Sequence, residues 1–593
     1  MATNKTRNKS EFKVLCINKD HNSSVCLTSS SHLLYYNQEE RISRIKRDSG
    51  MPLRCLNEVR EITDQVRSVV FTGYDIDMIS NCGLLTYLAK IGVKFDYIHA
   101  NAYPHHLSHA FRSFYASGFE EAIVVVRDGR GSTWKFYDGN EGYETTSVYK
   151  MSGKTETKIN LLYKKIYLEK VGRTKPYHII KEYEEMVNGR MCRFYPLEIW
   201  DDNTEVVLTE ELDVGEQYCE TAKELGYNFH DCGKVMGLAP YGKSDIDLGD
   251  PEFSKRAKIA HKVQERVEKE GLDLICEMVG RNYIPREEVA NVVLTGGVAL
   301  NVSANAYYRR NMVPGIKLFV DPLCGDEGNC LGMAQSYSNG WVNQDFDSIY
   351  IGGEPPEYDY KKKKWYNPFS KGVESSYVGI EKIVDLLVDG NVVALYQGRA
   401  EAGPRALGNR SLLFDPRIKN GKEIVNKIKG RESFRPLGCS IMQEHLDKWF
   451  ELICVQEDGE IFFTKESPYM MYAFDALEGV NEKVPSVVHV DNTCRLQTVT
   501  KEQNDVYWEL LNAFNKRVGV PLLGNTSFNL AGQPMVQSVE DAIDVLSSSP
   551  IEYLYLPDIS QLVRVSSMKV KTPEEIEEIR NTERTWREMT AWL

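Results

Sequence analysis

VANVVLTGGVALNVSANAYYRR, residues 289–310, places an apolar strand, a glycine turn and a segment of helical spacing in direct succession. A second stretch, AIVVVRDG at 122–129, is a short run of β-branched residues that ends in an Asp–Gly turn, which is typical of a strand buried on both faces. Strands that alternate with helices in this way predict an α/β architecture.

Three further segments extend the pattern on both sides. Residues 12–27 (FKVLCINKDHNSSVCL) predict a strand, a polar turn and a second strand, and residues 105–118 (HHLSHAFRSFYASG) have helical spacing and end in a glycine. Residues 391–411 (NVVALYQGRAEAGPRALGNRS) begin as a strand and continue into a loop rich in Arg. No internal repeat is visible.

The length of 593 residues predicts two to four domains. The best linker candidate is the segment 352–371, which is rich in Pro, Gly and Lys. We therefore expect one domain over residues 1–358 and a second over residues 359–593.

Composition excludes several classes of protein. The net charge of −13 disfavours a whole-surface grip on nucleic acid, and 42% hydrophobic with 26% charged residues is an ordinary globular mixture. No apolar run approaches the roughly 20 residues of a membrane span, and the start MATNKTRNKSEF lacks the apolar core of a signal peptide. The 13 Cys form no CxxC pair, so we expect reduced thiols in a cytoplasmic protein with no membrane partner.

A first candidate site is metal-binding. His105 and His109 are four residues apart, so on a helix both imidazoles project from one face, a spacing that suits a divalent metal. Asp128 and Asp326 are candidate carboxylate ligands because each ends an apolar or glycine-bounded segment. The alternative is a surface helix whose histidines have no role.

A second candidate site binds an anion. Arginines and a lysine lie among Gly, Pro and Ala with few acids, which suits a crowded pocket where guanidinium groups bind phosphate oxygens. The glycine turns at 294–301 and 325–332 could also hold a phosphate, or be turns and nothing more. Candidates for the pocket, with polar residues that could add hydrogen bonds, are Arg399, Arg405, Arg410, Arg417, Lys429, Arg431, Arg435, Arg495, Asn525, Ser527 and Asn529.

The segment 150–190 has ten Lys or Arg against five Glu, with tyrosines interleaved. Such a composition can hold phosphates and stack bases. The alternative is a solvated helix pair with the tyrosines packed beneath it.

In order along the chain, these segments resemble the ATP-dependent O-carbamoyltransferases, the family of the nodulation-factor and tobramycin carbamoyltransferases. The strings that carry the resemblance run collinearly from about residue 17 to residue 536. They are HNSSV, EERISRIKRD, HHLSHA, VVVRDGRGS, GKVMGLAPYGK, LTGGVALNVSAN, GDEGNCLGMA, QGRAEAGPRALGNRSLLFDPR, RESFRP, SPYM, HVDNTCRLQTV and LLGNTSFNLAGQPMV.

The resemblance implies an N-terminal Kae1-like domain of the actin/hexokinase type, followed by a C-terminal YrdC-like α/β domain. It further implies that carbamoyl phosphate and ATP form carbamoyladenylate, from which the carbamoyl group passes to an acceptor hydroxyl. The implied cofactor is a divalent metal, Fe²⁺ by family, and Mg²⁺ is a further candidate. A homodimer is the candidate oligomeric state.

Carried over by motif, the resemblance assigns roles to individual residues. Lys429, Arg435, Arg495 and Asn525 would hold carbamoyl phosphate. The metal ligands would be His105, His109 and Asp326 with Asp128 close by, and the transfer centre would include His21 and Lys46. The nucleotide would be bound by Gly296, Gly297, Asn301, Gly325 and Arg405.

The sequence also departs from the family pattern. HNSSV replaces HDASA, so Asn22 stands where an Asp is common, and Asp20 or Asp231 could instead activate the acceptor. RDGRGS lacks the Glu of the usual DGxGE form. Residues 135–215 match no family motif and are the best candidate for an acceptor-specific insertion.

Alternatives to this function stay open. The acceptor is expected to be a small alcohol, sugar or natural product, and a hydroxymethylated pyrimidine nucleotide or DNA base is the alternative. A threonylcarbamoyl-tRNA-type factor and a non-catalytic nucleotide-binding regulator are further alternatives, although the regulator predicts lost arginines that this chain retains.

Overall fold

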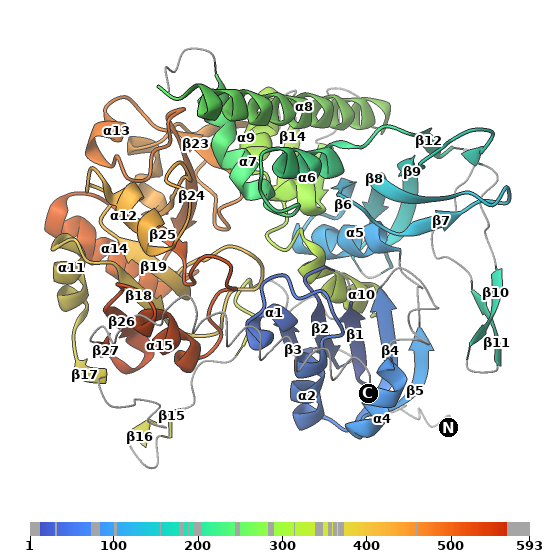
Figure 1. The fold of residues 1–593 in the computed structure, drawn as a ribbon, viewed down its shortest axis with the longest axis horizontal. Coiled ribbons are helices and arrows are strands. Elements are labelled where there is room, and N and C mark those ends of the chain that lie inside the picture. Colours follow the sequence, from blue (N-terminus) through green and yellow to red (C-terminus); the bar gives the residue numbers. More distant parts are fainter. Residues whose placement is uncertain are drawn as a thin grey trace, which may run out of the picture.

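The computed structural model describes residues 12–565, apart from residues 20, 30–31, 73–82, 100–103, 155, 177–182, 188–189, 195–202, 244–248, 283–289, 313–314, 339–347, 354–357, 360–363, 366–372 and 458–459. Three large sheets and the helices on their faces build this part of the chain (Figure 1). Only the backbone is described for three hairpins: β10 (Tyr183–Val187) with β11 (Arg190–Phe194), β15 (Tyr358–Asp359) with β16 (Lys364–Trp365), and β21 (Ile453–Glu457) with β22 (Glu460–Thr464).

The first sheet has five strands in the order β3-β2-β1-β4-β5. Strand β2 is antiparallel to both of its neighbours, β1 and β3, and β4 and β5 run parallel to β1. The predicted strand, turn and strand in residues 12–27 are confirmed. The strands are β1 (Val14–Asn18), β2 (Ser24–Thr28), β3 (Leu33–Gln38), β4 (Gln65–Thr72) and β5 (Lys94–His99), and the accompanying helices are α1 (Glu39–Ser43), α2 (Leu53–Ile62) and α4 (Leu84–Lys90).

The second sheet repeats this topology. Strand β8 pairs antiparallel with β6 and with β9, while β13 and β14 run parallel to β6, so five of its seven strands have the order β9-β8-β6-β13-β14. Strand β12 adds to the edge beside β9, and β7 pairs with β8. The duplicated order is the actin/hexokinase-type architecture that the sequence resemblance implies. The strands are β6 (Glu121–Arg127), β7 (Thr133–Lys135), β8 (Glu141–Ser152), β9 (Lys158–Tyr167), β12 (Glu205–Thr209), β13 (Ala290–Thr295) and β14 (Ile316–Val320).

Two helices, α5 (His105–Ala116) and α10 (Asn329–Tyr337), pack against each other between the first two sheets (Figure 1). They approach closely because Gly332 has no side chain: a Cβ there would lie 2.0 Å from the Ser108 carbonyl oxygen. The predicted helix at 105–118 is confirmed, with Gly118 at a φ of +74° just beyond its end.

The opposite face of the second sheet is covered by α6 (Val214–Glu224), α7 (Cys232–Leu238), α8 (Pro251–Asn282) and α9 (Val302–Asn311). Alternate residues of β6 face the two sides: Ile123 and Val125 join the core under these helices, and Val124 and Val126 join the core under α5. The expectation that β6 is buried on both faces is therefore confirmed.

The predicted strand, glycine turn and helix at 289–310 is confirmed by β13 and α9. The turn needs glycine at position 296, which has a φ of +84° and where a Cβ would lie 2.3 Å from the Arg127 carbonyl oxygen. Asn301 begins α9, because its side chain accepts a hydrogen bond from the Ala304 N–H.

The third sheet is mixed and has nine strands, in the order β17-β27-β26-β18-β19-β25-β20-β24-β23. Its strands are β17 (Val373–Tyr377), β18 (Val393–Tyr396), β19 (Arg410–Phe414), β20 (Gly438–Met442), β23 (Ala473–Asp475), β24 (Thr493–Val499), β25 (Leu522–Ser527), β26 (Tyr553–Leu556) and β27 (Gln561–Val565). Its helices are α11 (Ile380–Val388), α12 (Gly421–Ile428), α13 (Val480–Lys483), α14 (Asp505–Val518) and α15 (Val539–Ser547).

All three large sheets carry helices, so the predicted α/β class is confirmed. The boundary between residues 358 and 359 stays a prediction: the second sheet ends at Val320, the third begins at Val373, and most of the expected linker lies outside the described residues. Among the described residues, no helix has the length and apolar character that crossing a membrane requires.

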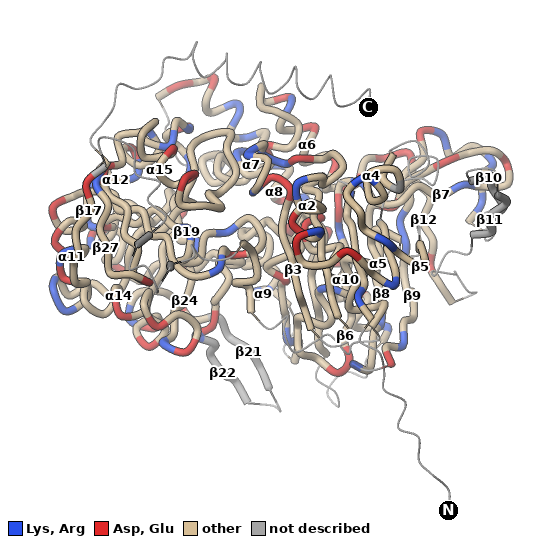
Figure 2. The backbone as a smooth tube through the Cα atoms, turned by 90° about the horizontal axis from the view of Figure 1, so that it is seen from below, with Lys and Arg blue, Asp and Glu red and all other residues tan. Residues whose placement is uncertain are grey.

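The basic segment 150–190 does not form the helix pair that was one interpretation of its composition. Its described parts are the end of β8, strand β9 and the hairpin β10–β11. Lys164 is completely buried and pairs with Glu144, and Lys165 pairs with Asp213. Elsewhere, basic and acidic residues are scattered among each other over the backbone (Figure 2). The strands β8, β9 and β12 make much of the unmatched stretch 135–215 part of the core sheet, and its expected role in acceptor binding stays a prediction.

Candidate active site

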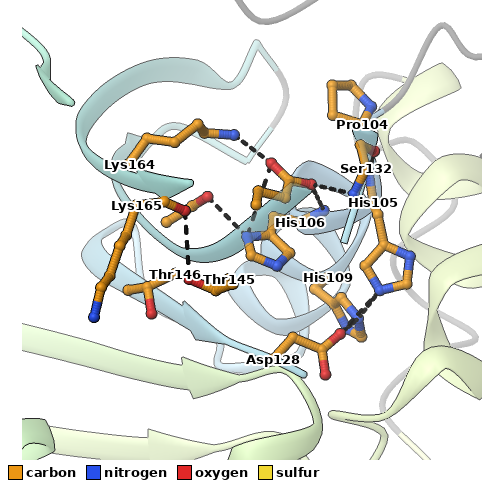
Figure 3. Close-up of polar contacts among 12 residues, drawn as sticks. Pro104, His105, His106, His109, Asp128, Ser132, Thr145, Thr146, Lys164 and Lys165 are labelled. Atoms are coloured by element: carbon orange, nitrogen blue, oxygen red, sulfur yellow. Dashed lines mark hydrogen bonds and ion pairs between the residues drawn. The ribbon is translucent and has the colours of Figure 1, made fainter. Parts of the chain in front are cut away.

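Four predicted residues meet at one point. His105 and His109 project from α5, Asp128 follows β6, and Asp326 begins the short 3₁₀ helix η4 (Asp326–Gly328). Their potential ligand atoms all lie within 4.8 Å of one another. His105 Nε2 is 3.0 Å from Asp128 Oδ2 and 3.4 Å from Asp326 Oδ1, and Figure 3 shows both imidazoles turned toward Asp128.

This cluster fits a divalent metal. The Nε2 atoms of His105 and His109 lie 3.0 Å apart, a distance at which one proton at most can lie between them. Burial raises the pKa of Asp326, but the adjacent imidazoles lower it by a larger amount, and the resulting pKa is about 2. Its carboxylate is therefore ionised at neutral pH. Two imidazoles and two carboxylates on neighbouring elements are the donor set of many metal enzymes.

A buried network holds the start of α5 from behind. Glu144 on β8 accepts hydrogen bonds from the backbone N–H groups of His106 and Ser132, both at 3.1 Å, and forms an ion pair with Lys164. The Ser132 hydroxyl in turn accepts the His105 N–H at 2.8 Å. Since the first N–H groups of a helix have no partner within it, these bonds fix the end that carries His105 (Figure 3).

A cavity of about 770 Å³ lies in front of the cluster and is lined by residues of both halves of the chain. Asp128 and Asp326 form part of its wall, while His105 and His109 are buried behind them. The other predicted site residues on the wall are His21, Lys46, Gly297, Asn301, Gly325, Arg405, Arg431, Arg435, Arg495, Asn525, Ser527 and Asn529. Gly296, Asp231, Lys429, Arg399, Arg410 and Arg417 are not among the lining residues. Arg410 instead donates to the carbonyl oxygens of Gln397 and Asn409, and Arg417 pairs with Asp415.

The end of the cavity formed by the C-terminal half is cationic. Burial and the neighbouring guanidiniums of Arg405 and Arg431 hold the pKa of Arg495 well below its usual value. The Nε atoms of Arg405 and Arg495 and the Oδ1 atom of Asn525 are buried without a hydrogen-bond partner among the described residues. Buried cations with unused donors are expected to bind an anion.

Lys429 supports this end from behind. Its ammonium group donates hydrogen bonds to the Ser527 carbonyl oxygen and to Asn529 Oδ1, the latter at 3.0 Å. Ser527 and Asn529 both line the cavity. The structure thus places Lys429 where it can orient wall residues.

Two predicted nucleotide contacts are already engaged within the protein. Asp128 Oδ1 accepts the N–H of Gly297 at 3.0 Å, so this N–H is directed at the metal cluster. Asn301 caps α9 and bonds to Gln264 on α8. Gly325 lies on the wall beside Glu327, and a Cβ there would lie 2.4 Å from a Glu327 carboxylate oxygen.

In the cavity wall, the rings of His21 and His230 pack against each other, with centroids 4.3 Å apart and planes tilted by 38°. Burial, together with His21 and Arg47, lowers the pKa of His230 to about 4. His21 Nε2 is buried and has no hydrogen-bond partner among the described residues. His21 Nε2 is therefore placed to accept a hydrogen bond from a hydroxyl bound in the cavity.

The sequence singled out Asp231 and missed His230, the residue before it. Asp231 forms ion pairs with Lys234 at 3.1 Å and Arg47 at 3.6 Å, and Lys234 lowers its pKa against the effect of burial. Its carboxylate is therefore a weak base. Asp20, the other candidate, lies outside the described residues. Proximity to the motif GKVMGLAPYGK was the available signal for His230.

Comparisons with known proteins identify the family. Residues 384–562 match the family model described as the carbamoyltransferase C-terminus. The chain is 28% identical to Nodulation protein NolNO of Sinorhizobium fredii, over 90% of this chain and 78% of that protein. It is 31% identical to Nodulation protein NolO of Bradyrhizobium diazoefficiens, over 59% of this chain and 69% of that protein.

Among solved structures, the likeness to HypF of T. kodakarensis has 13% identity and a TM-score of 0.30, and it covers 57% of this chain and 49% of HypF. The α/β sheets, the cavity and the relatives together define an enzyme that transfers a chemical group. The chain belongs to the carbamoyltransferase family.

Proposed function

We propose that this enzyme makes carbamoyladenylate from carbamoyl phosphate and ATP in its C-terminal half, and passes the carbamoyl group to a small hydroxyl-bearing acceptor in its N-terminal half. One observation carries the proposal: a single cavity joins the arginine cluster of the third sheet to the histidine–aspartate cluster between the first two sheets. A labile intermediate can then pass between the two centres without release to bulk water.

In the first step, the guanidiniums of Arg435 and Arg495 bind the phosphate of carbamoyl phosphate, and Asn525 presents its unused Oδ1 to the carbamoyl NH₂ group. Water hydrolyses carbamoyl phosphate to phosphate and carbamate. A carbamate oxygen then attacks the α-phosphorus of ATP and displaces pyrophosphate. The cationic wall favours this step because negative charge accumulates on the leaving phosphate groups.

In the second step, the acceptor oxygen attacks the carbamoyl carbon and AMP leaves. The hydroxyl proton passes to His21, whose Nε2 atom has no hydrogen-bond partner among the described residues, and Lys46 lies on the same wall. His105, His109, Asp128 and Asp326 would hold a divalent ion, with Fe²⁺ the leading candidate, which would supply a Lewis acid beside this point.

The environment of the lysines in the basic segment 150–190 favours a small acceptor over nucleic acid. Lys164 is buried and paired, and Lys165 is paired, so two of the lysines that could have held phosphates are engaged within the protein. The domain division near residue 358 belongs to the same proposal, with one half-reaction on each side.

The decisive experiment is an incubation with labelled carbamoyl phosphate, ATP and a panel of hydroxyl acceptors that includes sugars, natural-product alcohols and hydroxymethylpyrimidine nucleotides. We expect ATP–pyrophosphate exchange that depends on carbamoyl phosphate, and label in one acceptor class. Exchange that runs without carbamoyl phosphate would overturn the first step. Label transferred to nucleotides alone would overturn the small-alcohol acceptor.

A further inference from the structure

Two cysteines stand close together in the wall of the cavity. Cys219 on α6 and Cys232, the first residue of α7, place their sulfur atoms 3.2 Å apart. Both side chains line the cavity, and both are only partly buried. A small reagent that enters the cavity can therefore reach them, and no step of the proposed function uses them.

A second pair of close cysteines shows that proximity alone does not distinguish Cys219 and Cys232. The sulfur atoms of Cys439 on β20 and Cys494 on β24 lie 3.3 Å apart, but both residues are buried in the core of the third sheet and neither lines the cavity. The two pairs match in separation and differ in access, so Cys439 and Cys494 provide an internal control.

The surroundings favour reaction at one sulfur of the accessible pair. A hydrogen bond from Cys219 lowers the pKa of Cys232 against the effect of burial, and the Arg47 guanidinium lowers it further, while the Asp231 carboxylate opposes them. The same bond raises the pKa of the Cys219 thiol. Cys232 is thus the better nucleophile, and Cys219 is placed to attack it afterwards.

We propose that Cys219 and Cys232 form a reversible redox modification site in the cavity wall, which a small-molecule disulfide oxidises to an intramolecular disulfide. The Cys232 thiolate attacks the reagent RS–SR, which forms the mixed disulfide Cys232–S–SR and releases one RS⁻. Cys219, on losing its proton, then attacks the Cys232 sulfur and releases a second RS⁻. The two cysteines lose two electrons and two protons, and the reagent gains them as two RSH.

Oxidation should alter the transfer centre. The bond would draw α6 toward the start of α7, which directly follows His230 and Asp231. Displacing reacting groups by even 1 Å can slow a reaction by about a hundredfold, so we expect at least a tenfold loss of carbamoyl transfer that dithiothreitol reverses. This effect on activity rests on the proposed function, whereas formation of the disulfide does not.

The test uses the full chain, reduced and then treated with oxidised glutathione. Trypsin cleaves after Lys223, between the two cysteines, so the disulfide would appear in mass spectra as two linked peptides that separate on reduction. We expect this link in the folded protein, with Cys439 and Cys494 unmodified. In Cys219→Ser, which lacks the second thiol, we expect glutathione to remain attached to Cys232.

Three results would overturn the proposal: both thiols unmodified while the protein is folded, glutathione retained on Cys232 in the unaltered chain, or oxidation of Cys439 and Cys494 at an equal rate. If the linked peptides form but no acceptor is ever carbamoylated, the redox site stands and the proposed function fails.

Discussion

Glu144 and Lys164 form an ion pair with neither side chain exposed, directly behind the helix that carries His105 and His109. Removing two charges from water is unfavourable, so a buried ion pair is stable only where further hydrogen bonds compensate for the lost hydration. Glu144 has them, since it also accepts the N–H groups of His106 and Ser132. The pair therefore connects the core of the second sheet to the position of the metal cluster.

Replacement of Glu144 by Gln should leave the buried charge of Lys164 without an ionic partner. We expect the free energy of unfolding to fall by about 3 kcal/mol, because an unpaired buried charge is left behind. Urea denaturation of the metal-free protein measures this. The double variant Glu144→Gln with Lys164→Met removes both charges and should recover part of the loss. Equal stability of the Glu144→Gln variant and the unaltered chain would show that the pair contributes nothing.

The metal cluster leads to a second prediction. His109→Ala removes one ligand and should lower the bound metal content and the rate of carbamoyl transfer by at least about a hundredfold, while carbamoyladenylate formation continues. Metal analysis and single-turnover transfer assays measure the two effects. His106→Asn, on the same helix but outside the cluster, is the control and should retain metal. Full transfer activity in His109→Ala would contradict a metal role.

The two ends of the cavity should separate the two half-reactions. Arg435→Ala should slow carbamoyladenylate formation by about a hundredfold, because a charge-assisted contact to a bound phosphate is worth a few kcal/mol. His21→Ala should still form the adenylate and exchange pyrophosphate, but transfer slowly. Arg517→Ala, at an exposed site on α14 in the same half, is the control. Loss of the same half-reaction in both variants would refute the division of labour.

His230 should make stability depend on pH. Because its pKa in the folded chain is about 4, below the value of an unfolded histidine, the unfolded state binds the proton more readily. The stability of the unaltered chain relative to His230→Gln should therefore be constant above about pH 6.5 and decline as the pH falls toward 4. Urea denaturation of both proteins across this range measures the difference. A relative stability that rises on acidification would mean that His230 is protonated in the folded protein.

What the sequence could predict was set by local patterns. The i, i+4 spacing of His105 and His109, and the positions of Asp128 and Asp326 after apolar or glycine-bounded segments, are visible in a single sequence, and the structure brings all four together. The β-branched run at 122–129 likewise identified a strand buried on both sides.

What the sequence could not predict depends on contacts between distant segments. Glu144 lies in the stretch without a matching motif and meets His106 across 38 positions, and His230 reaches His21 only through the fold. The repeated topology of the first two sheets cannot be seen in the sequence, because the two sheets share strand order and direction but differ in sequence. Counting charges in 150–190 has a related limit, because a count treats the buried Lys164 as a surface residue.

The exposed charges of that segment permit a last test of the acceptor. Lys158, Lys170 and Arg173 are exposed, unlike Lys164, so replacing all three by Gln leaves the buried ion pair intact. For a small neutral acceptor we expect unchanged acceptor binding and both half-reactions at their normal rates. For a nucleic acid acceptor, each lost phosphate contact would reduce the slope of log K against log salt by about 0.7–0.9. Binding measured over a series of salt concentrations, with the acceptor found in the panel and with hydroxymethylpyrimidine DNA, separates the two outcomes. A flattened salt dependence in the triple variant would establish that this segment grips phosphates and would overturn the small-alcohol acceptor.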